Sequence, residues 1–331
     1  MEFKIKKGML TKYDPEEPVE NVIIPDGVTE INDHVFVGRN EIVSVSFPAS
    51  VEVIRAHAFQ DCTRLKRVIT EGTPRMFQNS FEGCPELIDE NGFMVIGGKL
   101  LSYFGKAKDI VIPDSVTEIL PKVFSNSYIT SVVIPDSVKS IGHAAFSECP
   151  YLAAVSFPAG LKIIENDLFS GCWSLKEITI PGSVLEIGFR AFADCYNLKK
   201  VNIMDGVRRI EQYAFGGCFD LQSITIPDSV YSVGTEAFRE CSHLRYVIAS
   251  DGTITSLDEE YPEVFFMDDD FEENGFDEPE DPTPYVLPGR FIFRPEAEDD
   301  VDYYPEDDSL GYYLDTVLMR KYILELENAE I

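Results

Sequence analysis

Positive charge is scarce in this sequence. Its 331 residues contain 28 Lys and Arg against 58 Asp and Glu, which gives a formal net charge of −30 at pH 7. A chain with this balance is repelled by phosphate backbones and by anionic lipid surfaces. The composition therefore argues against a nucleic-acid-binding protein. Hydrophobic residues still make up 44% of the chain, an ordinary value for a folded protein, so global disorder is not expected.

Long apolar runs are also missing. No run approaches the roughly 20 residues that a membrane-spanning helix requires, so we expect no transmembrane segment. The first residues, MEFKIKKGMLTKYDPEEP, carry cations but lack the continuous apolar stretch and small-residue cleavage site of a secretory signal. These absences predict a cytoplasmic protein.

The acidic residues concentrate near the C-terminus. Residues 258–331 hold 25 acids and 4 bases, a net of −21, whereas residues 1–257 hold 33 acids and 24 bases, a net of −9. This change in composition predicts a boundary near Leu257.

A repeat of 22 or 23 residues fills most of the region before that boundary. Its most regular feature is an anchor phenylalanine, which usually follows Ala and recurs at Phe36, Phe59, Phe81, Phe124, Phe146, Phe169, Phe192, Phe215 and Phe238. The surrounding pattern approximates IPxSVxxIGxxAFxxCxxLxxVxI, in which the final residues alternate as in a short strand and Pro follows where that strand would end. We expect each unit to contain a strand, a turn and a short helical or irregular return that carries the anchor phenylalanine.

Units of this size cannot bury an apolar face alone, so neighbouring units must stack and align their strands in parallel. The sequence therefore predicts a solenoid, α/β to mostly β, with the anchor phenylalanines in an internal column.

All seven cysteines occupy one slot of the repeat, three residues after an anchor phenylalanine. They are Cys62, Cys84, Cys149, Cys172, Cys195, Cys218 and Cys241. An odd number of cysteines in a repeated inner position, without a secretion signal, favours reduced and buried thiols. The CxxC pairs typical of zinc sites are missing, so we expect no metal and no other cofactor.

The recurring IPDSV, the following AF step and C-x-x-L-x-x-V resemble the BspA-like leucine-rich repeats over about residues 20–250. This resemblance implies a leucine-rich-repeat solenoid with a curved, parallel strand ladder. It also implies a role in protein binding, in many members at the cell surface.

Two segments match each other outside the regular repeat. Phe93–Tyr103 (FMVIGGKLLSY) is similar to Phe3–Tyr13 (FKIKKGMLTKY), and each precedes a near-identical strand and turn. We interpret residues 1–20 as an N-terminal hairpin cap on a solenoid of residues 21–257. The second copy, at about residues 88–108, is expected to be a hairpin insert that projects from the ladder.

Residues 258–331 are expected to form a small acidic α+β cap region with a partly disordered start. The segment YVLPGRFIFRP from Tyr285 suggests a hairpin-like pair, and Leu314–Asn328 has the apolar spacing of an amphipathic helix. Acids between residues 268 and 273 offer hard oxygen ligands to Ca²⁺, although their spacing does not fit an EF-hand.

The exposed strand positions form the candidate partner surface. It comprises Ser156, Lys176, Thr179, Lys199, Lys200, Asn202, Thr225, Arg245 and Tyr246. The alternative is that such residues merely suit a solvated sheet face. The cations among them join Arg208, Arg209 and Arg239 in a cationic strip, which suits an acidic partner or the chain's own acidic region.

Catalysis is not expected. The sequence contains no P-loop, Rossmann fingerprint, GxSxG elbow or HExxH motif. We therefore interpret the chain as a non-catalytic protein–protein interaction scaffold. Neither its partner nor its oligomeric state follows from the sequence. The alternatives are a surface-associated adhesion protein of the BspA-like type, exported by an unrecognised route, and a calcium-responsive acidic module.

Overall fold

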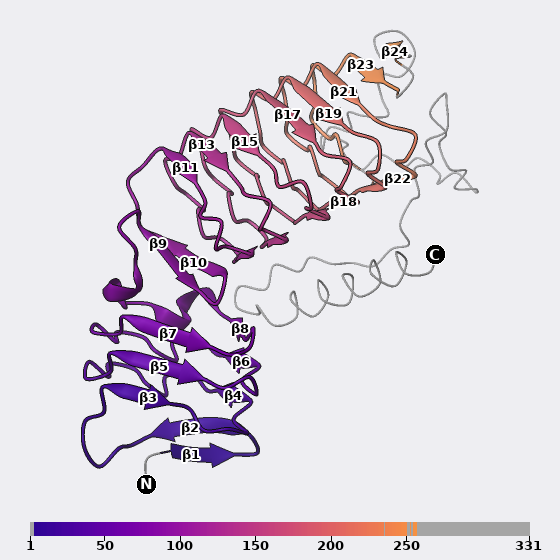
Figure 1. The fold of residues 1–331 in the computed structure, drawn as a ribbon. Helices are drawn as coiled ribbons and strands as arrows, with labels where there is room; N and C mark the ends of the chain where they lie inside the picture. The colour runs from indigo at the N-terminus through magenta and orange to yellow at the C-terminus, as the bar shows by residue number, and fades with distance from the viewer. Residues whose placement is uncertain (1–2, 235, 250–251, 253, 257–331) are drawn as a thin grey trace, which may run out of the picture. The chain divides into compact units, whose positions relative to one another are not determined.

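The computed structural model describes residues 3–234, 236–249, 252 and 254–256. Within these residues each coil contains a long strand, a turn, a two-residue strand and a second turn that leads to the next coil (Figure 1). Helix is limited to two 3-10 segments, η1 (Gln78–Phe81) and η2 (Pro85–Leu87). The predicted leucine-rich-repeat solenoid of mostly β structure is confirmed.

The long strands form three sheets. The first contains β3 (Asn21–Ile23), β5 (Ser44–Phe47) and β7 (Arg67–Thr70), and the second contains β11 (Asp109–Val111), β13 (Ser131–Val133) and β15 (Ala154–Ser156). The third contains β17 (Glu177–Ile180), β19 (Lys200–Ile203), β21 (Ser223–Thr225), β23 (Tyr246–Ile248) and β24 (Ile254–Ser256). All pairings in these sheets are parallel except that of β23 with β24.

The two-residue strands form three further sheets, two of which begin with a hairpin. The first is β1 (Phe3–Lys6), β2 (Met9–Tyr13), β4 (Glu30–Ile31), β6 (Val53–Ile54) and β8 (Arg75–Met76). The second is β9 (Phe93–Ile96), β10 (Lys99–Tyr103), β12 (Glu118–Ile119) and β14 (Ser140–Ile141), and the third is β16 (Ile163–Ile164), β18 (Glu186–Ile187), β20 (Arg209–Ile210) and β22 (Ser232–Val233). The sequence pattern did not predict these strands, because two residues are too few to show alternation.

The core is a column of anchor phenylalanine rings. Phe192 and Phe215 are fully buried, and their ring centroids lie 5.3 Å apart with the planes 3° from parallel. Similar stacking joins the rings of successive coils from Phe124 to Phe238. Because each ring needs its neighbours for burial, the column links the coils into one core.

Tyrosines from the hairpins start two such columns. Tyr13 packs against Phe36 with ring centroids 4.9 Å apart, and Tyr103 packs against Phe124 at 5.2 Å, with the ring planes tilted by 40° and 42°. The hairpins therefore supply the ring that a preceding coil would otherwise supply. The unusual 43-residue interval between Phe81 and Phe124 contains Tyr103 as the substituted anchor.

The second hairpin does not project. Phe93, Met94, Ile96, Leu100 and Leu101 all belong to the hydrophobic core, and each is at most 5% exposed. The expectation of a projecting insert is wrong, because apolar residues on both faces of this hairpin are covered.

The cysteines satisfy main-chain carbonyl groups of the column. Each thiol donates a hydrogen bond to the carbonyl oxygen of the anchor phenylalanine in the preceding coil, as Cys195 does to Phe169 at 3.2 Å. Arg39 occupies the same slot in the first coil, and its guanidinium donates to the carbonyl oxygen of Tyr13 at 2.9 Å. In both cases the side chain in this slot donates to the carbonyl group of the ring residue one coil earlier.

The predictions for residues 258–331, including the cap region, the hairpin-like pair, the terminal helix and the Ca²⁺ ligands, lie outside the described residues.

Candidate functional site

Most of the candidate partner residues lie on four neighbouring long strands. The parallel register places Thr179, Asn202 and Thr225 in one row, and it places Lys200 and Tyr246 in a second. We call the exposed side chains of β17, β19, β21 and β23, with the residues that immediately precede these strands, the β17–β23 face. Long, regular rows of this kind form because side chains alternate between the core and solvent along each strand.

A third row lies just before the strands. The main-chain N–H of Lys199 donates to the Lys176 carbonyl at 2.8 Å, and the N–H of Arg245 donates to the Gln222 carbonyl at 3.0 Å. Lys176, Lys199 and Lys200 are exposed, whereas Arg245 is half-buried. The row therefore concentrates positive charge at one end of the β17–β23 face.

Two of the lysines form no ion pair. Lys176 and Lys200 lie beyond ion-pair distance of every acid in the described part of the chain, although the exposed Glu177 is opposite Lys200 in the register of β17 with β19. Lys199 reaches Asp220 with 4.0 Å between Nζ and Oδ2, and both side chains are substantially exposed. An exposed pair at this distance contributes little and leaves Lys199 available to another carboxylate.

The cationic strip expected from the sequence is divided between different parts of the coil. Arg209 begins the short strand β20 and pairs with Glu186 and Glu211. Burial acts to lower the pKa of Arg209, but these two carboxylates outweigh it and raise the pKa. Arg239 lies in a turn, where it pairs with Glu236 and Glu240. Neither side chain belongs to the β17–β23 face.

Ser156 is separated from the other candidates. It ends β15, whose sheet contains β11 and β13 but not β17. Val155 in this strand and Phe157 directly after it pack against the core but are only partly buried. The register rows of the β17–β23 face therefore do not extend to Ser156.

An aromatic stack beside the β17–β23 face was missed in the sequence. Trp173, Tyr196 and Phe219 are 43%, 39% and 41% exposed, and their ring centroids are spaced by 6.0 and 5.4 Å. The N–H of Asp220 donates to the carbonyl of Tyr196, so the stack adjoins the partner of Lys199. Each ring directly follows a repeat cysteine, and this spacing is a signal that could have identified the stack.

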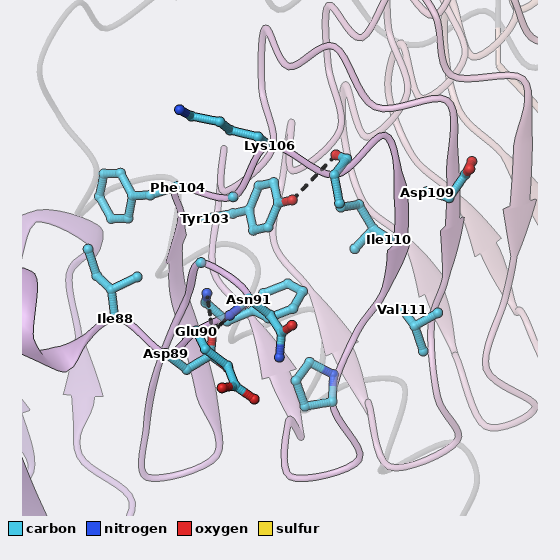
Figure 2. A pocket seen from close by; sticks show the side chains of 15 residues that line it. Ile88, Asp89, Glu90, Asn91, Tyr103, Phe104, Lys106, Asp109, Ile110 and Val111 are labelled. Atoms are coloured by element: carbon cyan, nitrogen blue, oxygen red, sulfur yellow. Dashed lines mark hydrogen bonds between the residues drawn. The ribbon is translucent and has the colours of Figure 1, made fainter.

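A groove of about 820 Å³ lies where the second hairpin meets β11. Figure 2 shows Ile88 and Phe104 on one side of it and Asp109 and Val111 on the other. Two of its lining residues are joined by the N–H of Phe104, which donates to the Gly92 carbonyl at 2.8 Å. Gly92 has φ 92°, and a Cβ there would collide with the main-chain nitrogen of Gly105. Glycine is therefore required at this close approach.

The thiols do not form a reactive centre. All seven cysteines are free and buried. Burial raises the pKa of Cys172, Cys195 and Cys218, and it raises that of Cys241 to about 12. Protonated, buried thiols are poor nucleophiles, so their repetition reflects the column rather than chemistry. No cluster of three or more His, Cys, Asp or Glu side chains in the described residues is arranged to hold a metal ion.

Among the described residues, no helix has the length and apolar character needed to span a membrane.

Stacked coils with parallel strands and an inner column of repeated apolar residues define a leucine-rich-repeat solenoid. The chain belongs to the BspA-type leucine-rich repeat family, whose model matches residues 13–130 and 117–245 in six copies. The resemblance noted in the sequence is thus confirmed. No curated protein matches the chain.

Solved structures of bacterial leucine-rich repeat proteins are among those similar to this chain. A leucine-rich cell surface protein from Faecalibacterium prausnitzii is 24% identical, with 73% of this chain and 90% of that chain covered and a TM-score of 0.28. The pneumococcal vaccine antigen PcpA is 18% identical, with 65% and 73% covered and a TM-score of 0.40. A protein from Bacteroides capillosus is 29% identical, with 35% and 97% covered and a TM-score of 0.32.

Proposed function

We propose that this chain is a non-catalytic protein-interaction scaffold that binds an acidic partner protein through the β17–β23 face. The observation that carries this proposal is the group of exposed lysines at the start of β17 and β19. Lys176 and Lys200 have no ion pair with the described residues, although the chain as a whole carries a charge of −30. Exposed cations on a regular face favour association with a complementary, acidic surface.

The aromatic stack supports the same surface. Trp173, Tyr196 and Phe219 form an exposed stack next to the lysine row. Exposed aromatic residues that become buried on association commonly contribute most of the binding energy, while surrounding charges set specificity. We therefore assign the anchor role to the stack and the selection of an acidic partner to the lysines.

The proposal is tested by affinity capture from the native cell with the full chain and two charge variants. Lys199→Glu with Lys200→Glu reverses charge on the β17–β23 face. Lys4→Glu with Lys6→Glu makes the same charge change on the exposed strand β1, far along the sequence. We expect the first variant to retain roughly a tenth or less of the partner and the second to retain it all, because reversing paired charges costs a few kcal/mol.

A third variant separates the aromatic contribution. Tyr196→Ser removes the central ring of the stack without changing the net charge, and it should also weaken capture. Unfolding midpoints of all variants establish that the coils remain folded. Capture of the same proteins in the same amounts by the wild type and by the Lys199→Glu, Lys200→Glu variant would exclude the β17–β23 face as the binding surface.

The alternative proposal is adhesion at the cell surface through the same solenoid, which the family suggests because many of its members are surface-associated. Cell fractionation distinguishes this alternative from a cytoplasmic scaffold. Recovery in the cytoplasmic fraction supports the scaffold, whereas protease-accessible protein on intact cells supports adhesion.

A further inference from the structure

The strand β11 has a free edge. It begins its sheet and pairs only with β13, in the register Asp109 with Ser131 and Val111 with Val133. The N–H of Ile112 donates to the Val133 carbonyl, and the Lys108 carbonyl accepts from Thr130. Because alternate residues of a strand direct their main-chain groups to opposite sides, those of Asp109 and Val111 face away from β13.

This edge is unpaired and accessible. No main-chain group in the described residues bonds to the N–H or carbonyl groups of Asp109 and Val111. The hairpin that precedes β11 continues the sheet of short strands, through β10 and β12, and does not cover the long strand. An exposed row of unpaired N–H and carbonyl groups is a template for an additional strand.

The groove beside this edge is lined by exposed apolar side chains and by acidic side chains. Phe104 and Val111 line it and are 60% and 68% exposed. Its charged side chains are Asp89, Glu90, Asp109 and Lys106, three acids against one base. Hydrogen bonds from Ser131 and Thr130 lower the pKa of Asp109, which keeps this carboxylate ionised at neutral pH. The groove therefore fits an extended segment that carries aromatic or aliphatic residues together with cations.

The chain itself contains one such segment. Residues 290–294 read RFIFR and are bounded by Gly289 and Pro295. In an extended strand Phe291 and Phe293 face one side, while Arg290 and Arg294 face the other. These arginines are two of only four bases in residues 258–331, a region that otherwise holds 25 acids.

We propose that residues 290–294 dock in this groove as an additional strand on the free edge of β11. The two phenylalanines lie against the exposed Phe104, and the arginines face the acids of the groove. The connection is long enough. About 34 residues separate Ser256 from Arg290, which reach on the order of 110 Å when extended. The path from β23 back to β11 crosses about six strand spacings of roughly 4.8 Å each. The inference is independent of the proposed function, since it concerns a different edge and a different charge.

Amide-resolved hydrogen exchange of the full chain tests the docking. The amides of Asp109 and Val111 should be protected in the wild type, although no described residue pairs with them. The charge variant Arg290→Glu with Arg294→Glu should release them, with exchange at least about tenfold faster. The amides of Ile110 and Ile112 point toward β13 and should stay protected in every variant, which reports that the coil is intact.

The matched control is Arg320→Glu with Lys321→Glu, which alters the only other two bases of the C-terminal region by the same charge. It should leave Asp109 and Val111 protected. Unprotected amides at both positions in the wild type, or equal acceleration in the two variants, would overturn the proposal. Protection that increases with protein concentration would also overturn it, since the occupant would then be a second copy of the chain.

Discussion

The two hairpins have the same backbone but different surroundings. Phe3 pairs with Tyr13 and Phe93 pairs with Tyr103, and both hairpins shift register at the same place. Gly8 (φ 82°) and Gly98 (φ 79°) approach Thr29 and Thr117 so closely that a Cβ would lie 2.7 and 2.8 Å from the hydroxyl oxygens. Glycine and the tyrosine anchor therefore specify this hairpin at both positions.

The side chains that differ between the two hairpins show whether the outer face of each hairpin is covered. Lys4 and Lys6 of the first hairpin are exposed, whereas Met94 and Ile96 at the matching positions of the second are 2% and 3% exposed. Ile88 forms a bridge to Met94, and a Cβ on Gly97 would lie 2.9 Å from the Thr70 hydroxyl. The first hairpin thus starts a stack of coils with one of its faces in solvent. The second hairpin starts a second stack and has both faces covered.

The largest expected effect concerns the ring column that follows each hairpin. Phe59 and Phe192 are both fully buried. Phe59→Ala and Phe192→Ala should each lower the stability by about 3–5 kcal/mol, because the truncated ring leaves a cavity between two stacked neighbours. Chemical denaturation measures both. An unchanged unfolding midpoint for either variant would show that its column does not hold the coils together.

The next effect distinguishes the hairpins directly. Met94→Ala should cost about 2–5 kcal/mol, since it removes a buried side chain. Lys4→Ala, at the matching position, should change stability by less than about 0.5 kcal/mol. Thermal unfolding of the two variants compares them. Equal losses would contradict the view that only the second hairpin is covered on both faces.

A smaller effect depends on pH. Burial raises the pKa of Glu186, and the nearby Arg209 only partly opposes this. A raised folded-state pKa means that the ionised form is penalised, so this group destabilises the fold as the pH rises through that pKa. Glu186→Gln should therefore be more stable than the wild type at pH 7, and the difference should shrink as the pH falls toward the carboxylate range.

Denaturation at a series of pH values checks the prediction for Glu186. Glu30→Gln is the matched control, because Glu30 holds the same position of a short strand and pairs with Arg55 in the first stack. A Glu186→Gln variant that loses stability at pH 7 would contradict the assigned burial cost.

The smallest expected effect is the reaction of thiol reagents with the native chain. Buried cysteines should react negligibly in the native chain because the reagent cannot reach them, and all seven should react after denaturation. Mass spectrometry of partially labelled chains adds a comparison of the two stacks. If they open separately, Cys62 and Cys84 should be labelled together and apart from the five later cysteines. Rapid native labelling of Cys195 would contradict its position in the column.

Repetition made much of the fold predictable. The anchor phenylalanines and the cysteine slot recur often enough to identify the column, and the similarity of Phe93–Tyr103 to Phe3–Tyr13 identifies the second hairpin. The burial of that hairpin was not predicted, although Met94 and Ile96 replace lysines on one face. Coverage by a preceding coil is a tertiary effect that a local pattern does not record.

The candidate surface was only partly predictable. Alternation along the strands identified Lys200 and Thr179 as exposed and placed the half-buried Asn202 on the same face, because the side-chain period of a strand is two. It grouped Arg209 and Arg239 with them, since sequence proximity does not show on which side of a coil a residue lies. The stack of Trp173, Tyr196 and Phe219 was missed because each ring lies in a turn, where no alternation exists.

Hydrogen exchange of the full chain, alone and with its captured partner, tests the central claim most directly. The account predicts new protection in β17, β19 and β21 and in the turn that holds Tyr196, with no change in β1 or β2. Protection confined to the first stack, from β1 to β7, would contradict it.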